Sequence, residues 1–506
     1  MTETIKRESS FFSDRRISLF VLIILVVCYF VYFKDLGKMT VRMWDEARVA
    51  INAFEMTQNG NWLVAHYNGR PDMWSTKPPL QIWLVALFMK LMGPTELALR
   101  LPSAISATCT VFVLFMFGTR YLKDMDAGFA SAMILIASMG YADWHIATTG
   151  DRDSLLVLWT TLGSLLYFIY VQDMDGKKKL IYPVVIFFTL AVLTKGIGGL
   201  LLLPGLFLYT LYRRRLRAVI GARDFWKALP IFLIVVPAYY LGREYVNPGY
   251  IRAVINNETL RRYITLVDAS QHSYWFYLKH LCNWRLIPWI FMLPFSVVVT
   301  VLSRKDEVRK FSIFCLFYLI PFFLVISGSD TKQLWYDAPI YPITSLLVGI
   351  SLVEIFNLTA GRIIPKNLSV SIVLPLYILV IVSLPTLWVY NYIHRPSHTN
   401  IAPAIDYGGF LRKITEGDSG LRKLSFINEG YNAHLLFYVE IENANGYKIK
   451  IKSLKDDLNE SEVVVGCGTD IRKAIEQRYA TEILRSGRDC TVFRVEQQIR
   501  ATSRHN

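Results

Sequence analysis

The 506-residue chain has few charged side chains for its length. Asp, Glu, Lys and Arg make up 19% of it and hydrophobic residues 53%, whereas soluble domains carry about 25% charged residues. The mean hydropathy is +0.34. A water-soluble fold of this size could not bury so much apolar surface, so the composition predicts a polytopic membrane protein.

Three further absences narrow the class of protein. The six cysteines show no CxxC spacing, which excludes a zinc ribbon or a thioredoxin-type site. No repeat of solenoid period is present. The first apolar run lacks a small-residue cleavage signal, so we expect a retained anchor. The net charge of +15 does not require a nucleic-acid partner, because basic residues of membrane proteins gather in cytoplasmic loops and set orientation.

Long apolar runs are the dominant feature of the first 393 residues. A spanning helix needs about 17 to 25 largely apolar residues, and about eleven runs approach this length. The two shortest are separated only by Thr194, Lys195 and Gly196, which predicts a tight turn. The predicted spans are 17–33, 97–118, 126–143, 154–172, 180–194, 197–212, 228–246, 284–303, 311–327, 338–356 and 369–391.

The segment Leu80–Met92 decides the predicted topology. It is apolar but too short to cross the membrane comfortably, so we expect it to lie flat in the interface. The basic clusters at 177–179, 213–217 and 304–310 then share the cytoplasmic side with the N-terminus. The long loops 34–96 and 247–283 and the C-terminus fall outside, and chemistry is expected on the side where the loops are elaborated.

The tail at 394–506 is polar and predicts a small α/β domain outside the cytoplasm, following an all-α membrane domain at 1–393. Strands are expected at 424–429, 447–453, 462–466 and 491–496, and helices at 431–440 and 470–484. Cys467 and Cys490 are the cysteines of this domain. They are consistent either with a disulfide in an oxidising compartment or with two buried free thiols.

The first candidate site follows the first span. Asp45 and Glu46, flanked by Trp44 and Arg48, open a short amphipathic helix at the membrane surface. One interpretation is that Asp45 merely caps the N-terminus of this helix. Alternatively, partial burial beside Trp44 suits a carboxylate to base chemistry, because burial raises the pKa of a carboxyl group.

A second candidate is Lys77, which precedes two prolines and the Leu80–Met92 helix. A cation held at headgroup depth by a rigid turn can meet a lipid phosphate, although a lysine there can also simply extend toward water. A third is the pair Asp151 and Asp153, whose spacing would suit a divalent metal shared with a phosphate. Asp153 could instead cap the next helix.

Two aromatic and basic stretches lie on the same predicted face. One holds Lys332 and Tyr336, and the other holds Arg262 and His272. Both could contact a substrate that carries a phosphate. Their aromatic residues also fit an interfacial belt, and His272 alone could be a hydrogen-bonded surface histidine.

Taken in order, these features resemble the GT-C membrane glycosyltransferases, and in particular the bacterial lipid A aminoarabinose transferases and protein O-mannosyltransferases. The likeness covers about residues 40 to 345. The motifs that carry it are Asp45-Glu46 with Arg48, Lys77-Pro78-Pro79-Leu80, Arg100-Leu101-Pro102-Ser103, Asp153, and the stretch from Lys332 to Pro342.

The resemblance implies transfer of a sugar from a polyprenyl-phosphate donor to a lipid or protein acceptor outside the cytoplasm. It implies that Asp45 is the acidic catalytic residue with Glu46 beside it, that Asp153 is a second acid, that Arg48 and Lys77 bind the donor phosphate and that Tyr336 lines the donor site. From the residues themselves, Lys332 and Arg262 are further candidate phosphate ligands, and Trp44, Asp151 and His272 are candidate lining residues.

One position departs from the family pattern. The aminoarabinose transferases have an acid immediately before the lysine, where this chain has Thr76. A divalent metal is therefore an open expectation, and no residue is assigned to it.

Two other classes of function remain as alternatives. A transporter or flippase for lipid-linked substrates would bind near the bilayer midplane, with broken helices and two matching halves. The predicted spans are unequal and no half-repeat is visible. A non-catalytic assembly or sensor protein would act through its C-terminal domain, and removal of residues 400–506 would abolish its function.

Overall fold

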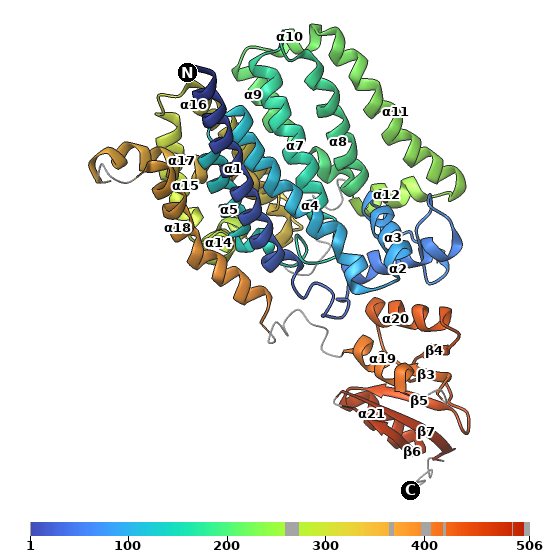
Figure 1. The fold of residues 1–506 in the computed structure, drawn as a ribbon. Coiled ribbons are helices and arrows are strands. Elements are labelled where there is room, and N and C mark those ends of the chain that lie inside the picture. The colour runs from blue at the N-terminus through green and yellow to red at the C-terminus, as the bar shows by residue number, and fades with distance from the viewer. Residues whose placement is uncertain are drawn as a thin grey trace. The chain divides into compact units, whose positions relative to one another are not determined.

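The computed structural model describes residues 2–258, 273–363, 369–395, 406–417, 421–487 and 489–499. The chain forms two compact units (Figure 1). Unit 1 comprises Met1–Leu36, Asp72–Leu84 and Arg100–Arg395. Unit 2 comprises Gly37–Pro71, Val85–Leu99 and Pro396–Asn506.

Unit 1 is built from helices, and two helices, α3 and α4, begin in one unit and end in the other. Its long helices are α1 (Thr2–Cys28), α4 (Glu96–Met116), α7 (Asp153–Gln172), α8 (Ile181–Lys195), α11 (Arg223–Val246), α15 (Trp289–Val301), α16 (Asp306–Gly328), α17 (Ile340–Ile363) and α18 (Val370–Ile393). The shorter ones are α3 (Leu80–Met92), α5 (Met125–Ile136), α6 (Met139–Ala142), α9 (Leu203–Tyr212), α10 (Leu216–Gly221), α12 (Tyr250–Glu258) and α14 (Phe276–His280).

Brief segments of 3-10 or π-helix extend or join these helices. They are η1 (Tyr29–Phe33), η2 (Phe117–Tyr121), η3 (Lys178–Leu180), η4 (Gly196–Leu200), η5 (Leu281–Arg285) and η6 (Leu334–Asp337).

Among the described residues, eight helices are long and apolar enough to cross a membrane. A ninth span results if Phe276–Arg285 and Trp289–Val301, which meet at a bend of 105°, are counted as one. The all-α membrane fold is thus confirmed, while the predicted number of spans is not. Helices α5 and α9, which belong to two of the predicted spans, are only 12 and 10 residues long.

The predicted span at 126–143 is interrupted where α5 ends at Ile136. Ser138 adopts an extended backbone, and its hydroxyl donates a hydrogen bond to the Ile134 carbonyl. The short helix α6 follows, and its Gly140 carbonyl accepts a hydrogen bond from the buried Arg285. An apolar run gives no sign of this break, because the partner of the freed carbonyl comes from a distant part of the chain.

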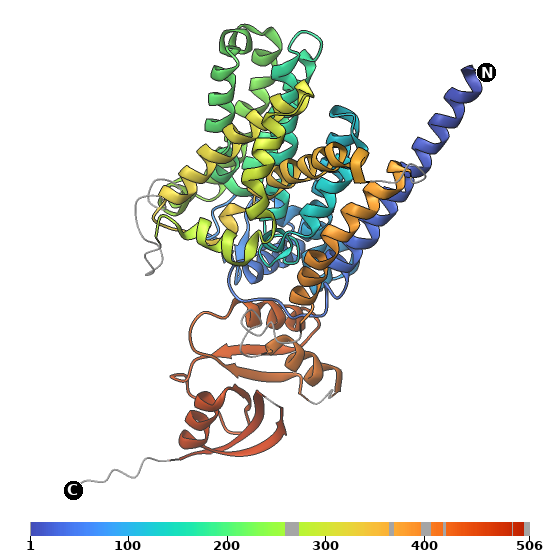
Figure 2. The same cartoon turned by 90° about the vertical axis from the view of Figure 1, so that its left-hand side faces the viewer.

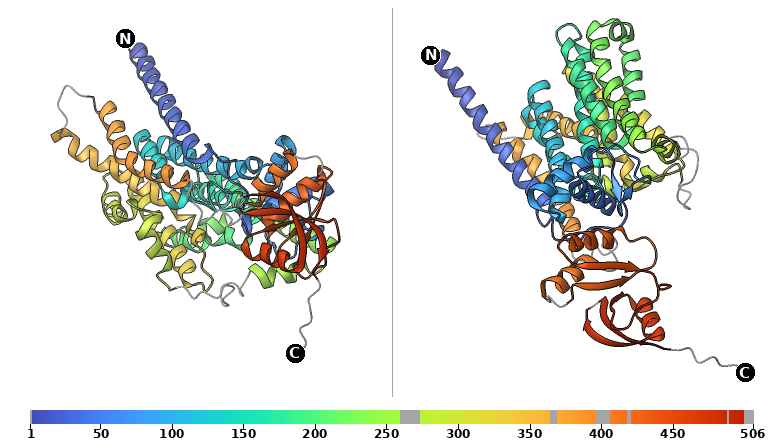
Figure 3. Two further views of the ribbon diagram at one scale, coloured as in Figure 1. Left: turned by 90° about the horizontal axis from the view of Figure 1, so that it is seen from below. Right: turned by 90° about the vertical axis from the view of Figure 1, so that its right-hand side faces the viewer.

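Close helix crossings in unit 1 depend on glycine. A Cβ on Gly349 of α17 would lie 2.5 Å from the backbone nitrogen of Ser131 on α5, and a Cβ on Gly205 of α9 would lie 2.2 Å from the Phe317 carbonyl on α16. Small residues at such crossings let backbones approach in a membrane, where apolar burial alone does not drive helix association. Helix α18, which comes from the other end of the sequence of unit 1, contacts η1, the continuation of α1, and runs beside it (Figures 2 and 3).

Unit 2 joins the first long loop to the C-terminal tail. The loop contributes α2 (Asp45–Asn59) and a hairpin of β1 (His66–Tyr67) and β2 (Arg70–Pro71). The predicted amphipathic helix after Trp44 is therefore present. The second predicted interfacial helix has the expected bounds, Leu80–Met92.

The tail of unit 2 carries a mixed five-stranded sheet in the order β4-β3-β5-β7-β6. The central strands β3 and β5 are parallel, with Phe426 opposite Val465, and β7 runs antiparallel to β5. Helix α20 packs beside β4, and α21 beside β5 and β6 (Figure 2). The elements are α19 (Tyr407–Gly417), β3 (Lys423–Ile427), α20 (Ala433–Ala444), β4 (Lys448–Lys452), β5 (Val463–Cys467), α21 (Thr469–Arg478), β6 (Tyr479–Ser486) and β7 (Cys490–Gln498).

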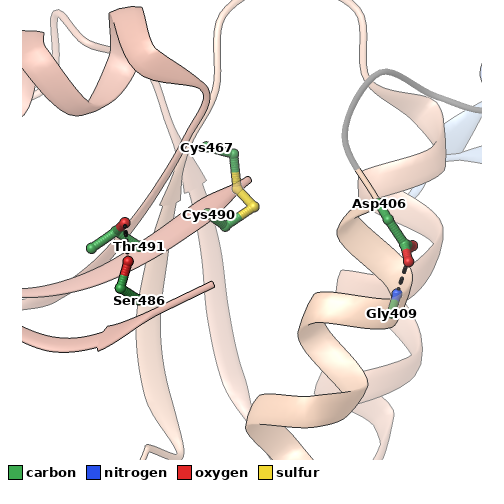
Figure 4. Close-up of a disulfide and its surroundings, with 6 residues drawn as sticks. All are labelled: Asp406, Gly409, Cys467, Ser486, Cys490 and Thr491. Carbon is green, nitrogen blue, oxygen red and sulfur yellow. Dashed lines mark hydrogen bonds between the residues drawn. A yellow bond between two sulfur atoms is a disulfide. The ribbon is translucent and has the colours of Figure 1, made fainter. Parts of the chain in front are cut away.

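The prediction of an α/β domain is confirmed, with two corrections. The helix predicted at 470–484 ends at Arg478, and Tyr479–Ser486 forms the edge strand β6, whose pairing with β7 is invisible to local periodicity. Helix α19 was not predicted. Its N-terminus is capped by Asp406, which accepts a hydrogen bond from the Gly409 N–H (Figure 4).

The two cysteines of the sheet form a disulfide. Cys467 ends β5 and Cys490 begins β7, and these two residues are direct partners in the antiparallel register (Figure 4). The disulfide alternative of the sequence prediction is therefore the one that the fold adopts. The other cysteines, Cys28, Cys109, Cys282 and Cys315, are free.

Candidate functional site

A cavity of about 270 Å³ in unit 1 collects several of the predicted site residues. Lys77, Asp153 and Tyr336, taken from three separate motifs, all line it. Much of the remaining wall is apolar. The lining residues are Lys77, Asp153, Leu156, Lys195, Ile197, Gly198, Leu201, Glu258, Phe322, Val325, Ile326, Ser329, Thr331, Trp335, Tyr336 and Pro339.

The first cation of the cavity is Lys77, which lies in the turn before α3. Its Nζ is 3.2 Å from Oε1 of Glu258, the last residue of α12. The same oxygen accepts a 3.3 Å hydrogen bond from the Thr76 hydroxyl. Tyr250 of α12 donates to the Thr76 carbonyl over 2.7 Å. Helix α12 therefore fixes the turn that presents Lys77, and Glu258 places a carboxylate beside Thr76.

The second cation is Lys195, at the C-terminus of α8. Its Nζ donates a hydrogen bond to Asp153 and lies 5.2 Å from the centroid of the Tyr336 ring. Helix α8 ends here because Gly196 adopts a positive φ of 58° and the chain continues as η4.

Asp153 is the first residue of α7 and is 3% exposed. The residue in the N-cap position is Arg152, so the interpretation of Asp153 as an N-cap is wrong. Its carboxylate is instead paired with Lys195 from the neighbouring helix α8.

A buried ion pair holds Tyr336 in place. Tyr336 lies in η6, whose last residue, Asp337, accepts two hydrogen bonds from Arg285, of 2.9 and 3.0 Å. Tyr341 donates to the same carboxylate over 2.9 Å. Burial raises the pKa of Asp337, and the Arg285 guanidinium opposes this effect. A carboxylate that is buried but paired bidentately makes η6 a rigid support for the cavity wall.

Asp151 has different partners from Asp153. Its carboxylate accepts a 2.6 Å hydrogen bond from the Thr149 hydroxyl, and it lies 3.4 Å from Nδ1 of His145. The His145 ring stacks on Trp335 with a centroid distance of 3.5 Å. The two acids of this pair thus make different contacts, and only Asp153 lines the cavity.

Lys332 lies near the cavity without lining it. It is 6% exposed, and its Nζ donates a hydrogen bond to the Ser329 carbonyl. Ser329 and Thr331 both line the cavity. The other two residues of the predicted set, Arg262 and His272, lie outside the described residues.

The remaining predicted residues open helix α2 in unit 2. Trp44 occupies the N-cap position without a side-chain capping hydrogen bond, and Asp45 is the first helical residue, so the N-cap interpretation of Asp45 is wrong. Glu46 is 2% exposed and accepts a 2.9 Å hydrogen bond from the Arg42 N–H. The Arg48 guanidinium lies 4.3 Å from the centroid of the Tyr67 ring in the hairpin.

Two residues of the cavity were absent from the predicted site. Lys195 is expected from the sequence only as part of a tight turn, and Glu258 is not among the candidate site residues. Both are charged residues at the end of a helix. Their contacts join segments 42 and about 180 residues apart, and no local pattern indicates such pairing. A lysine between two apolar runs is the one signal available, because charge next to a membrane span is costly unless it is paired or functional.

In chemical terms, the cavity joins two ammonium groups to an apolar wall. Lys77 and Lys195 are each paired with a carboxylate, Glu258 and Asp153 respectively. Ammonium groups of this kind bind phosphate as point charges. The apolar wall is suited to a hydrocarbon chain, so the cavity can accept a molecule that carries both a phosphate and a lipid.

Sequence comparisons connect this arrangement to known transferases. Residues 76–240 match the dolichyl-phosphate-mannose-protein mannosyltransferase family. The undecaprenyl phosphate-alpha-4-amino-4-deoxy-L-arabinose arabinosyl transferase of Pseudomonas savastanoi pv. phaseolicola is 27% identical over 403 residues, which are 78% of this chain and 72% of that protein. A transferase of the same name from Pseudomonas fluorescens is 27% identical over 361 residues, 68% of this chain and 59% of its own length.

Solved structures share the fold over almost the whole chain. The structure of ArnT from Cupriavidus metallidurans bound to undecaprenyl phosphate has a TM-score of 0.72 at 16% identity, and covers 94% of this chain and 97% of its own. The likeness to the GT-C membrane glycosyltransferases is confirmed. The oligosaccharyltransferase of Archaeoglobus fulgidus has a TM-score of 0.52 at 12% identity, over 95% of this chain and 74% of its own. Together with the apolar helices, these likenesses identify an integral inner-membrane protein.

Proposed function

We propose that this GT-C-like protein is a glycosyltransferase that takes a sugar from a polyprenyl-phosphate donor and transfers it, with inversion, to a lipid acceptor of the lipid A type. The observation that carries the proposal is the cavity of unit 1, which combines Lys77, Lys195 and Tyr336 with an apolar wall. The names of the two Pseudomonas relatives, which include undecaprenyl phosphate and an aminoarabinose, support this choice of donor.

The donor reaction explains why the cavity needs cations. Cleavage of the bond between the sugar and the polyprenyl phosphate leaves a phosphate monoester, so negative charge grows on the phosphate in the transition state. Lys77 and Lys195 would stabilise that charge. Tyr336 would line the donor, and Lys332, Arg48 and Arg262 remain proposed further cations.

The acceptor needs a group that removes its proton or orients it. We assign this role to Asp45, which as general base would accept the proton of the acceptor hydroxyl while its oxygen displaces the polyprenyl phosphate. Direct attack of that oxygen on the anomeric carbon inverts its configuration. Glu46, whose carboxylate closes the turn before α2, would support Asp45. Asp153 would orient Lys195 through their ion pair.

Trp44 and His272 remain proposed lining residues, whereas Asp151 is not among the residues that line the cavity. Asp151 and His145 are compatible with a divalent metal, because the Asp151 carboxylate lies 3.4 Å from Nδ1 of His145. The proposed reaction assigns no step to a metal.

The membrane orientation is also a proposal. The N-terminus would lie in the cytoplasm, with the cavity and the C-terminal domain on the outer side. Two features of unit 1 support this: the start of α1 lies at the same end of the unit as α10, which follows the Arg213–Arg215 cluster, and α12 lies toward the other end (Figure 1).

The test is a transfer assay with the purified full chain in lipid nanodiscs. Polyprenyl phosphates with different radiolabelled sugars are supplied together with a lipid A fraction or with membrane protein, and the fraction that takes up label is identified. We expect label in the lipid fraction. Label in protein would instead favour a protein O-mannosyltransferase activity, which the matched family suggests.

Asp45→Asn is the decisive variant. We expect it to abolish transfer while the protein remains folded and still binds polyprenyl phosphate. Full activity of Asp45→Asn would overturn the assigned base. Movement of intact labelled donor across sealed vesicles, without transfer to any acceptor, would replace the proposed enzyme with a flippase.

A further inference from the structure

The backbone just before Asp45 is held in an unusual conformation. Trp44 has φ 74° and ψ −124°, a region that residues with a large side chain rarely adopt. Such a conformation persists only where surrounding contacts over-determine it, and it is found preferentially at functional sites. The contacts that hold residues 41–44 therefore bear on the position of the neighbouring carboxylate.

One of these contacts comes from α20 in the C-terminal part of unit 2. The buried Val41 N–H donates a 2.8 Å hydrogen bond to the hydroxyl of Tyr438, which is itself buried. That hydroxyl donates onward to Oε1 of Glu96 over 2.6 Å. Arg412 of α19 pairs with the same Glu96 oxygen at 2.5 Å. Tyr438 is thus a fixed acceptor for the backbone that leads into α2.

A second contact comes from Tyr431, which lies two residues before α20. The Tyr431 ring stacks on the Trp44 ring, with a centroid distance of 4.7 Å and an interplanar angle of 16°. Trp44 is otherwise 60% exposed. Stacking fixes the plane of the Trp44 side chain and thereby restrains its strained backbone.

These restraints pass directly to the first turn of α2. The Arg42 N–H is bound by the Glu46 carboxylate, and the Arg48 N–H donates to the Trp44 carbonyl over 3.0 Å. A shift of residues 41–44 would consequently move Asp45, which lies between these anchor points.

We infer that Tyr438 and Tyr431 are positioning residues for Asp45, so that the C-terminal domain takes part in catalysis by fixing the backbone in front of the base. The inference rests on the proposed function, since it takes Asp45 as the base. It also means that removing residues 400–506 would disturb α2, so point variants are the sharper probe of this domain.

The main test is Tyr438→Phe, which keeps the ring and removes the hydroxyl. We expect kcat for sugar transfer to fall by about 10-fold or more, because displacement of a catalytic group by about 1 Å can cost about 100-fold. The KM for the polyprenyl-phosphate donor should stay within about two-fold, because the donor cavity lies in unit 1.

Tyr479→Phe is the matched control. The Tyr479 hydroxyl also accepts a backbone N–H, that of Leu458 over 3.2 Å, and Tyr479 is likewise buried in the C-terminal domain. This variant should lose the hydrogen bond from a backbone N–H and keep its kcat. Melting temperatures of both variants are measured in parallel, because Tyr438→Phe also loses the bond to Glu96, and kcat is compared at a temperature where both variants are folded.

Tyr431 gives an independent pair of variants. Tyr431→Ala removes the stacking and should lower kcat, whereas Tyr431→Phe retains the ring and should restore it. Equal kcat in Tyr438→Phe, Tyr479→Phe and the unchanged protein, together with full activity of Tyr431→Ala, would overturn the inference. An equal loss in Tyr438→Phe and Tyr479→Phe would also overturn it, since that result reflects general destabilisation.

The outcome for Asp45→Asn separates the two proposals. If Asp45→Asn is active, the proposed base is wrong, whatever the tyrosine variants do. If Asp45→Asn is inactive and the tyrosine variants match the unchanged protein, only the positioning role fails.

Discussion

The ion pair between Lys77 and Glu258 makes a quantitative prediction about donor binding. Glu258 forms an ion pair with Lys77, the cation that we assign to the donor phosphate. A phosphate must therefore compete with this carboxylate. Replacing Glu258 with glutamine removes the competing charge while retaining a side chain that can accept the Thr76 hydrogen bond.

The magnitude follows from the geometry of the pair. At 3.2 Å, two unit charges attract by about 5 kcal/mol at an effective dielectric constant of about 20. Desolvation and side-chain ordering offset most of this, and exposed pairs retain only about 0.2–1 kcal/mol. Because the two side chains are only 14% and 12% exposed, we expect about 1–2 kcal/mol. This corresponds to roughly 5- to 30-fold tighter binding of polyprenyl phosphate by Glu258→Gln.

The assay is a binding titration of polyprenyl phosphate with the full chain in nanodiscs at two salt concentrations. Glu354→Gln serves as the matched control, because Glu354 pairs with Lys305 at 3.1 Å and is 16% exposed, yet it does not line the cavity. Its affinity should equal that of the unchanged protein. Unchanged or weaker binding by Glu258→Gln would refute the reasoning, because Glu258 would then support Lys77 instead of competing for it.

Two further predictions concern buried charge. Lys195→Met should weaken binding of polyprenyl phosphate and lower the melting temperature, because it leaves the 3% exposed Asp153 without its cation. Loss of one partner of a buried ion pair costs about 3–5 kcal/mol. The double variant Lys195→Met with Asp153→Asn should regain stability but not binding, and recovery of both would contradict a phosphate-binding role for Lys195. Burial and the neighbouring Glu55 raise the pKa of Glu440 above its ordinary 4.5, so the folded chain binds more protons than the unfolded chain and stability should fall as pH rises above the ordinary carboxyl range. Glu440→Gln should flatten this slope, which melting temperatures at pH 5 and pH 8 would reveal; an unchanged slope would place the pH dependence elsewhere.

Much of the helical framework could be predicted from local pattern. The bounds of Leu80–Met92 were predicted correctly, because an apolar run between Pro79 and Gly93 has clear limits. The helix beginning at Asp45 was predicted from its apolar spacing. Strand β6 was missed, because an edge strand of mixed polarity is defined by its pairing with β7 and not by its own sequence.

The candidate site divides in the same way. The sequence by itself determined the membrane class, the likeness to GT-C enzymes and three residues of the cavity, Lys77, Asp153 and Tyr336, because composition and short motifs are local properties. Only the tertiary structure decided that Lys195 and Glu258 join them, and that Tyr431 and Tyr438 hold the backbone before Asp45. The physical reason is that ion pairs, stacking and hydrogen bonds between distant segments depend on how helices pack, and a pattern read along one segment carries no record of its partner.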